Sequence, residues 1–220
     1  MNVQEATTRR LPDLKGRYLP ENCRETINTI LKETYGYEQF RNLEIYDDLS
    51  KGKEKLCISQ GQLIENVILE AEKAWKGETQ VDNILLTAPT GSGKSLLFQL
   101  PAIYLGKEYN LLTIVVSPLK ALIVDQVESL QELGYTRVAY ASSDLSPEQK
   151  MEVYRQVREG EIDLFYLSPE LLLSYDIKHF VGERRIGLVV VDEAHTVTTW
   201  GKEFRVDYWF LGRYLTALKQ

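Results

Sequence analysis

The sequence predicts an α/β fold in which a mostly parallel sheet carries helices on both faces. From about residue 111 onward, short apolar runs alternate with segments of helical periodicity. Runs such as Ile186–Val191 are apolar almost throughout, which is typical of parallel strands that are covered on both sides. Residues of unusual chemistry follow several of these runs directly. In such sheets ligands bind beyond the carboxyl ends of the strands, so we expect these residues to converge on one rim.

The chain begins with a polar stretch of about 20 residues that contains several helix breakers. Its basic residues could touch nucleic acid or form a solvated tail; they are Arg9, Arg10, Lys15 and Arg17. Helical spacing of apolar residues starts near Glu21, and Gly36 is a typical C-terminal stop. We therefore expect an N-terminal arm and helix over residues 1–34 and one domain over residues 35–220.

The next segments combine aromatic, helical and apolar patterns. Residues 35–41 read as an aromatic packing cluster, and residues 62–75 have an apolar helical face. The apolar run from Ile84 to Leu86 predicts a buried strand. A helix should follow Ser95, and Pro101 should end or kink it.

The remaining elements follow from apolar periodicity and from cap residues. Ser146 followed by Pro147 predicts an N-cap and a first helical position. The expected elements are strands at 111–117, 138–141, 162–167 and 186–191, a helix after Pro118 that Gly134 closes, and a helix from Pro147 to about Glu159.

A loop of small residues after Ile84–Leu86 predicts a nucleoside triphosphate site. Glycines let backbone N–H groups turn inward, and the following helix N-terminus adds positive partial charge. A lysine here reaches the β- and γ-phosphates, and the next hydroxyl holds Mg²⁺. The alternative interpretation is a Gly/Ser-rich turn without a ligand. The usual phosphate-loop pattern begins with glycine, and here that position is Ala88. The phosphate-binding residues are Thr90, Gly91, Ser92, Gly93, Lys94 and Ser95.

An acidic pair follows the last apolar strand directly. Asp192 suits binding of Mg²⁺, and Glu193 can orient or deprotonate the attacking water. Such a pair is also common in solvated turns, but its place in the α/β order relative to Lys94 favours catalysis. The predicted reaction is hydrolysis of the γ-phosphate.

Composition sets outer limits on function. Hydrophobic residues make up 44% of the 220 residues, enough for a sizeable core. The net charge of −6 argues against a generally basic nucleic-acid-binding surface, although a local groove stays open. Cys23 and Cys57 are far apart, so we expect reduced thiols rather than a zinc site or disulfide. Without a signal-peptide pattern or membrane span, the expected location is the cytoplasm, or the nucleus in a eukaryote.

The two motifs, Ala88–Ser95 and Asp192–His195, together resemble motifs I and II of superfamily 2 helicases, with the DEAH spelling. More narrowly, the chain resembles the first RecA-like domain of RecQ-family DNA helicases. Further matches are Phe98–Ala102 after the loop, a motif Ia at Val116–Val127, a motif Ib at Leu167–Glu170, and the RecQ aromatic-rich loop at Trp200–Tyr208. The resemblance covers roughly residue 35 to the end.

This resemblance implies an ATP-driven DNA translocase that uses Mg²⁺, with His195 beside the acidic pair. It also implies an aromatic-rich loop that senses single-stranded DNA or a single/double-strand junction. Trp200 and Phe204 could equally be core anchors for the last helix. The residues implied in DNA contact or coupling are Ser117, Lys120, Ser168, Trp200, Phe204 and Arg205.

In RecQ proteins a Tyr, an Arg and a Gln within one short motif read adenine. Tyr37 and Arg41 match the first two, but Glu44 stands where Gln is expected. We interpret residues 42–59 as an insertion that splits the motif, with Gln62 supplying the amide, although Gln60 is close by.

The resemblance also implies a second RecA-like lobe that is not in this sequence, so we expect one lobe of a longer helicase with weak ATPase activity alone. An alternative function is an ATP-dependent switch or scaffold in a repair or defence complex. A small-molecule P-loop kinase is disfavoured because a kinase has no use for a DNA-coupling loop there.

Overall fold

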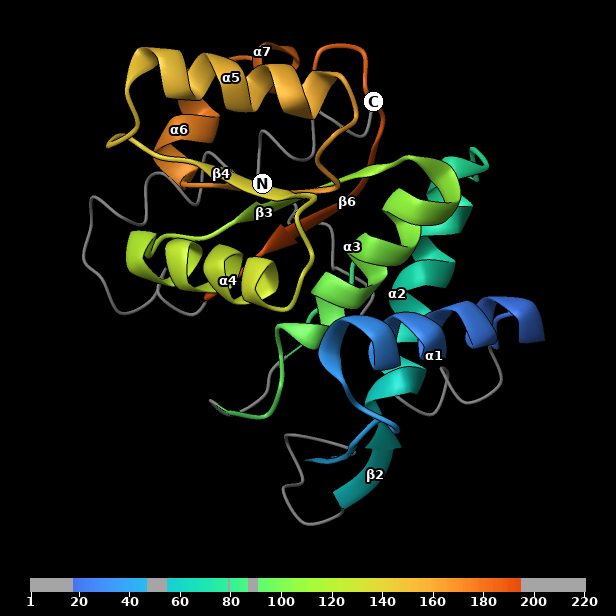
Figure 1. Ribbon diagram of the computed structural model, residues 1–220. Helices are drawn as coiled ribbons and strands as arrows, with labels where there is room; N and C mark the ends of the chain where they lie inside the picture. Colours follow the sequence, from blue (N-terminus) through green and yellow to red (C-terminus); the bar gives the residue numbers. More distant parts are fainter. Residues whose placement is uncertain (1–17, 47–54, 79, 87–90, 195–220) are drawn as a thin grey trace, which may run out of the picture. The chain divides into compact units, whose positions relative to one another are not determined.

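The computed structural model describes residues 18–46, 55–78, 80–86 and 91–194 (Figure 1). The chain divides into two compact units, residues 1–104 and residues 105–220. Each unit is described by itself below. Within the described residues no helix is long and apolar enough to cross a membrane, and Cys23 and Cys57 are free thiols.

The first unit is mainly helical. Helix α1 (Glu21–Tyr35) buries Ile27, Ile30 and Leu31, and ends at Gly36, whose φ of 69° is left-handed as expected for a glycine C-cap. Helix α2 (Gln60–Trp75) buries one apolar face and begins at Ser59, whose hydroxyl accepts a hydrogen bond from the Gly61 N–H. Both helices were predicted from apolar spacing, and α2 starts two residues earlier than expected.

The insertion between Arg41 and Gln60 forms an antiparallel hairpin that the sequence did not predict. Strand β1 (Asn42–Tyr46) pairs with β2 (Lys55–Ser59), with Leu43 opposite Ile58 and Glu44 opposite Cys57. The first pair sets Asn42 opposite Ser59, so the hairpin leaves and rejoins the unit at adjacent points. Consequently Arg41 and Gln60, 19 positions apart in the chain, are neighbours.

The expected strand over Ile84–Leu86 is wrong: residues 80–86 have no regular structure, and Leu85 is 79% exposed. A strand exists only when a neighbouring strand completes its hydrogen bonds. Within the described part of the first unit the only strands are those of the hairpin, which pair with each other. This segment is instead tied to α2, because the Asp82 N–H donates to the Glu70 carboxylate at 3.0 Å.

Helix α3 (Leu96–Tyr109) continues through Pro101, so of the two expected effects, an end or a kink, the end is wrong. Proline removes one backbone hydrogen bond and crowds the preceding turn. Here the residues on both sides of Pro101 are buried, among them Leu100, Ala102 and Leu105. Burial of this apolar surface outweighs the lost hydrogen bond.

The second unit is a four-stranded parallel sheet in the order β4-β5-β3-β6. Its strands are β3 (Leu112–Val116), β4 (Val138–Ala141), β5 (Leu164–Leu167) and β6 (Ile186–Val191). Its helices are α4 (Lys120–Glu132), α5 (Pro147–Arg158), α6 (Pro169–Ser174) and α7 (Ile177–Val181). Helix α4 covers one face of the sheet, and α5, α6 and α7 cover the other (Figure 1). The predicted α/β class with helices on both faces is confirmed.

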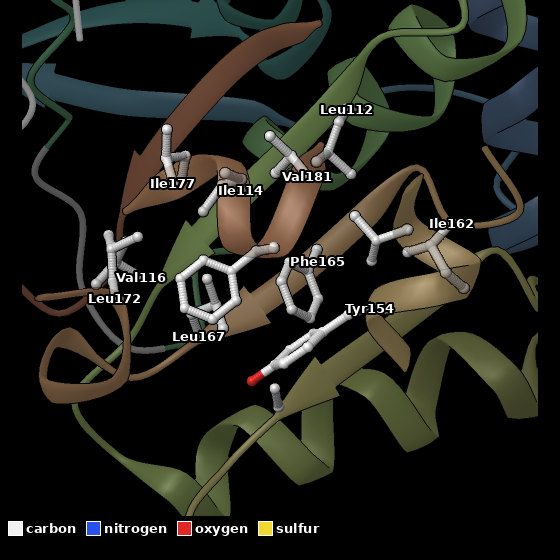
Figure 2. Close-up of a cluster of buried hydrophobic side chains, with 13 residues drawn as sticks. Leu112, Ile114, Val116, Tyr154, Ile162, Phe165, Leu167, Leu172, Ile177 and Val181 are labelled. Atoms are coloured by element: carbon white, nitrogen blue, oxygen red, sulfur yellow. The ribbon is translucent and has the colours of Figure 1, made fainter. Parts of the chain in front are cut away.

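The core of this unit lies between the sheet and α5–α7 (Figure 2). Alternate residues of β3 point to this face, as do Phe165 and Leu167 of β5. Tyr154 of α5 meets the ring of Phe180 of α7 edge to face, with centroids 5.2 Å apart. The predicted cap of α5 is present, since Ser146 and Gln149 form a capping box.

A buried ionic cluster closes the amino end of β5. The Asp163 side chain is 3% exposed and pairs with Arg137 at 2.6 Å and with Arg184, itself 5% exposed, at 3.0 Å. The hydrogen bond to Asp163 raises the pKa of Arg137, whereas burial lowers the pKa of Arg184. Gly106 of α3 is needed beside this cluster, because an added Cβ would lie 2.3 Å from the Asp163 carboxyl carbon. The cluster therefore joins α3, β4, β5 and the loop before β6.

Candidate nucleotide site

The phosphate loop has the backbone that its glycines predict. Gly91 and Gly93 have φ values of 80° and 79°, in the left-handed region that favours glycine. The Leu96 N–H donates to the Gly93 carbonyl at 3.2 Å, and the Leu97 N–H donates to the Lys94 carbonyl at 3.0 Å. These turns lead directly into α3, so Lys94 and Ser95 stand at a helix N-terminus, where backbone N–H groups and the helix dipole favour anions.

Gln60 connects the phosphate loop to the hairpin junction. Its side chain is buried, with the whole residue 2% exposed. The amide Nε2 donates to the Ser92 carbonyl at 3.2 Å, and Oε1 accepts from the Arg41 N–H at 3.2 Å. The Gln60 N–H in turn donates to the Arg41 carbonyl at 2.9 Å. One side chain therefore fixes both the loop and the residue before the insertion.

The left-handed φ of 79° and the packing of Gln60 together favour glycine at residue 93. A Cβ on Gly93 would lie 2.8 Å from Gln60 Nε2, which is closer than such atoms approach in proteins. Gly61 has a similar role on the other side, because a Cβ there would lie 2.6 Å from the Phe40 ring. The two glycines let Gln60 sit between the loop and the aromatic cluster.

Gln62 is the residue that the sequence favoured for reading adenine, and this assignment stays a prediction. It lines a cavity of about 270 Å³ that also borders Phe40, Gly61 and Glu65. Of the other two predicted adenine-site residues, the Arg41 guanidinium lies over the Tyr37 ring, 5.7 Å from its centroid. Gln60 thus contacts both Arg41 and the phosphate loop, and Arg41 contacts Tyr37, whereas neither Arg41 nor Gln60 lines the cavity that Gln62 borders.

Three predicted residues of the second unit meet at the carboxyl edge of its sheet. Val116 of β3 is in register with Leu167 of β5 and with Val191 of β6. The next residues along these strands are Ser117, Ser168 and Asp192, and the backbones of Ser117 and Asp192 stay bonded to a neighbouring strand. The Ser117 N–H donates to the Leu167 carbonyl at 3.1 Å, and the Asp192 N–H donates to the Val116 carbonyl at 2.9 Å. Their predicted convergence is confirmed.

Ser117, Ser168 and Lys120 have different local environments at this edge. Ser117 is 1% exposed, and its hydroxyl is buried without a hydrogen-bond partner in the structure. Ser168 is the N-cap of α6 and accepts a hydrogen bond from the Leu171 N–H. Lys120, the first residue of α4, forms an exposed ion pair with Asp144. An exposed pair of this kind contributes little to stability and can be exchanged for another anion.

Asp192 and Glu193 form a tight turn at the end of β6. The Glu193 N–H donates to Asp192 Oδ1 at 2.9 Å, and Glu193 has a φ of 50°. A left-handed backbone costs free energy for any residue other than glycine, and such residues cluster at functional sites.

Gln126 is a site residue that the sequence reasoning missed. It lies on α4, and its Nε2 donates to Asp192 Oδ2 at 3.3 Å. Its Oε1 accepts from the hydroxyl of Tyr166 on β5 at 2.9 Å. Gln126 belongs to the stretch Val116–Val127 that resembles motif Ia, but no site role was predicted for it, and only the fold reveals that it contacts Asp192.

The donor chemistry on these two segments fits Mg²⁺. This ion prefers hard oxygen ligands, takes one or two from the protein and completes its shell with phosphates and water. Ser95 offers a hydroxyl and Asp192 offers a carboxylate. The Gln126 amide and the Glu193 N–H, which donate to this carboxylate, are both uncharged. In the described residues no group of three His, Cys, Asp or Glu side chains could form a metal site made of protein alone.

Several predicted residues lie outside the described part of the chain: Thr90, His195, Trp200, Phe204 and Arg205. Lys94 belongs to the first unit and Asp192 to the second. The convergence of the phosphate loop with the acidic pair therefore stays a prediction.

Residues 63–217 match the family model of DEAD/DEAH box helicases. Among curated proteins, the chain is 30% identical to the ATP-dependent DNA helicase RecQ of Haemophilus influenzae over 187 residues, which are 85% of this chain and 25% of that protein. It is 34% identical to RecQ of Synechocystis sp. and 32% identical to RecQ of Bacillus subtilis, covering 86% and 82% of this chain. These alignments cover 33% and 25% of the two proteins, so this chain spans a quarter to a third of its relatives' length.

A solved structure with a similar fold is the DUF1998 helicase MrfA bound to DNA and AMPPNP. Its TM-score is 0.50 at 22% sequence identity, with 82% of this chain and 22% of that chain covered. At this identity the likeness bears on the fold alone.

Proposed function

Because the chain belongs to the DEAD/DEAH box helicase family, we propose that it is the ATP-binding lobe of a RecQ-type DNA helicase. The whole protein would hydrolyse ATP to move along DNA or unwind it. The observation that supports this proposal is that one chain has both a phosphate loop formed by glycines and an acidic pair at the carboxyl end of a parallel strand. The identity to RecQ proteins along most of the chain supports the finer assignment.

Each residue of the two motifs has a defined task in this reaction. Backbone N–H groups of Gly91–Ser95 and the Lys94 ammonium bind the phosphates. Ser95 and Asp192 would hold Mg²⁺, which when bound neutralises charge on the β- and γ-phosphates. Glu193 orients the attacking water and accepts its proton. Lys94 then faces the charge that develops on the transferred phosphoryl group.

We assign adenine recognition to Gln60 rather than to Gln62. Gln60 is adjacent to Arg41 and to the phosphate loop, whereas Gln62 lines a separate cavity. A carboxamide has two N–H donors and two acceptor lone pairs. The bonds to Ser92 and Arg41 use one of each, which leaves one donor and one acceptor for the amino group and ring nitrogen of adenine.

DNA is the proposed partner of the carboxyl edge near Ser117, Lys120 and Ser168. Lys120 can exchange Asp144 for a DNA phosphate, because an exposed ion pair is weak and screened by salt. A second lobe of the same family would complete the ATP site with an arginine, as one lobe supplies half of the groups that the reaction needs.

The proposal is tested with the full-length protein that contains this chain. ATP hydrolysis is measured with and without single-stranded DNA, and strand separation is measured on a fluorescent partial duplex. DNA-stimulated hydrolysis with strand separation is the expected result. ATP binding without DNA-stimulated hydrolysis would replace this function by that of a nucleotide-dependent switch or scaffold.

A further inference from the structure

The side chains of Tyr166, Gln126 and Asp192 form a hydrogen-bonded chain across three elements of the second unit. The Tyr166 hydroxyl donates to Gln126 Oε1 at 2.9 Å, and Gln126 Nε2 donates to Asp192 Oδ2 at 3.3 Å. Tyr166 lies in the middle of the sheet on β5 and is fully buried, so its hydroxyl is a fixed point. Its neighbours Phe165 and Leu167 face α5–α7, so Tyr166 faces the other side of the sheet, which α4 covers (Figure 1).

The chemistry of the two ends sets the direction of the central amide. An ionised carboxylate only accepts hydrogen bonds, so the amide must present its N–H to Asp192. Its carbonyl oxygen then faces Tyr166, whose hydroxyl can donate. With the amide reversed, an oxygen would oppose the Asp192 carboxylate, which is electrostatically unfavourable. The hydroxyl of Tyr166 therefore selects the amide orientation that Asp192 needs.

A neutral donor is well suited to a carboxylate that must also bind a cation. The Gln126 amide fixes the rotation of the carboxyl group together with the Glu193 N–H on the other oxygen. It adds no positive charge, so it does not compete with Mg²⁺ as an arginine or lysine in its place would. Partners that orient a ligating carboxylate commonly change metal affinity when they are removed.

We propose that Gln126, held by Tyr166, is a positioning residue that orients the Asp192 carboxylate for Mg²⁺. This inference rests on the proposed function, in which Asp192 binds the metal of the Mg²⁺–ATP complex. Gln126 itself touches neither nucleotide nor metal. Its effect should appear in the metal dependence of nucleotide binding, and not in the affinity for metal-free nucleotide.

The test uses four variants of the full-length protein. Gln126→Met keeps side-chain length but removes both hydrogen bonds, and Tyr166→Phe removes the hydroxyl alone. The third variant combines the two. The control, Gln131→Met, makes the same substitution at an exposed position of α4. Binding of a fluorescent ATP analogue is measured against Mg²⁺ concentration and, separately, in EDTA.

Gln126→Met should raise the Mg²⁺ concentration for half-maximal binding about tenfold and leave binding in EDTA unchanged. Tyr166→Phe should raise this Mg²⁺ concentration by a smaller factor. The double variant should need no more Mg²⁺ than Gln126→Met, because Tyr166 acts on Asp192 only through Gln126. If Gln126→Met fails to fold, the Mg²⁺ requirement of Tyr166→Phe still tests the inference. An unchanged Mg²⁺ requirement, or equal weakening with and without Mg²⁺, overturns the inference. Loss of DNA-stimulated hydrolysis in the wild type, with these binding shifts intact, would overturn only the proposed function.

Discussion

The Gln60 side chain donates a hydrogen bond to the backbone carbonyl of Ser92, 3.2 Å away, across 32 positions of the chain. The same amide accepts a hydrogen bond from the Arg41 N–H. The insertion separates Arg41 and Gln60 in the chain, but its two strands pair along their length, so its two ends lie together and the two residues meet. Gln60 therefore holds the phosphate loop, although the insertion separates it in the chain from Tyr37 and Arg41. This contact leads to the first two predictions below.

Gln60→Ala should weaken ATP binding about tenfold, because hydrogen bonds of roughly 0.5–1.5 kcal/mol each to the loop and to adenine are lost. It should also reduce the preference for ATP over GTP. Gln62→Ala is the matched control and should leave both properties unchanged, since Gln62 lines the separate cavity. Competition binding with the two nucleotides measures the effect. Loss of the ATP preference in Gln62→Ala alone would reverse the assignment.

Gly93→Ala should abolish ATP binding at concentrations that saturate the wild type. The new methyl group would contact Gln60 Nε2 and force a left-handed residue to carry a Cβ. Gly77→Ala is a close control, because Gly77 has the same φ of 79° but open space around it. Both substitutions should lower the free energy of unfolding by about 1–2 kcal/mol, and Gly93→Ala alone should lose nucleotide. Equal ATP affinity in the two variants would contradict the packing argument.

Asp163→Asn should destabilise the second unit by about 3–5 kcal/mol, because it leaves the Arg184 guanidinium buried without its counter-charge. Glu152→Gln makes the equivalent change in the exposed ion pair with Arg155, and should leave the free energy of unfolding unchanged. Urea denaturation of both variants measures the difference. A small effect at Asp163, similar to that at Glu152, would show that the cluster is not an anchor.

Ionisation of the buried Glu65 carboxyl group should lower the free energy of unfolding as the pH rises. Burial raises the pKa of Glu65 above its usual value of 4.5, although the Leu19 N–H donates to its carboxylate. A raised pKa in the folded state means that the stabilising contribution is complete below the ordinary pKa and is lost as the pH rises through the folded value. Glu65→Gln should therefore gain stability over the wild type as the pH rises above the ordinary value of 4.5. A gain that instead grows on acidification would contradict the assigned sign.

Much of the second unit could be read from the sequence. Ser146 followed by Pro147 identified the start of α5, and the apolar run Ile186–Val191 identified β6 with its acidic pair. The meeting of Ser117, Ser168 and Asp192 followed from one rule, that the carboxyl ends of parallel strands share an edge. These features depend on local patterns or on strand direction, which a sequence contains.

The remaining features depend on which neighbour a residue meets. Ile84–Leu86 has a strand pattern, but a strand also needs a partner, and none is present among the described residues of its unit. The strands β1 and β2 are five residues each and are joined by a longer segment than a two-residue turn, so only their register shows that Arg41 meets Gln60. Gln126 belongs to the motif Ia stretch, but its contacts with Tyr166 and Asp192 come from two other elements and could not be predicted from that stretch.

The central claim is that Glu193 activates water for hydrolysis of an ATP held by the phosphate loop. The most direct measurement compares wild type and Glu193→Gln in the full-length protein, with single-stranded DNA present. DNA-stimulated ATP hydrolysis should fall at least about a hundredfold, as expected when a general base is lost. Affinity for the ATP analogue should stay within about twofold, since Glu193 does not hold the phosphates. Hydrolysis at the wild-type rate by Glu193→Gln would contradict the account.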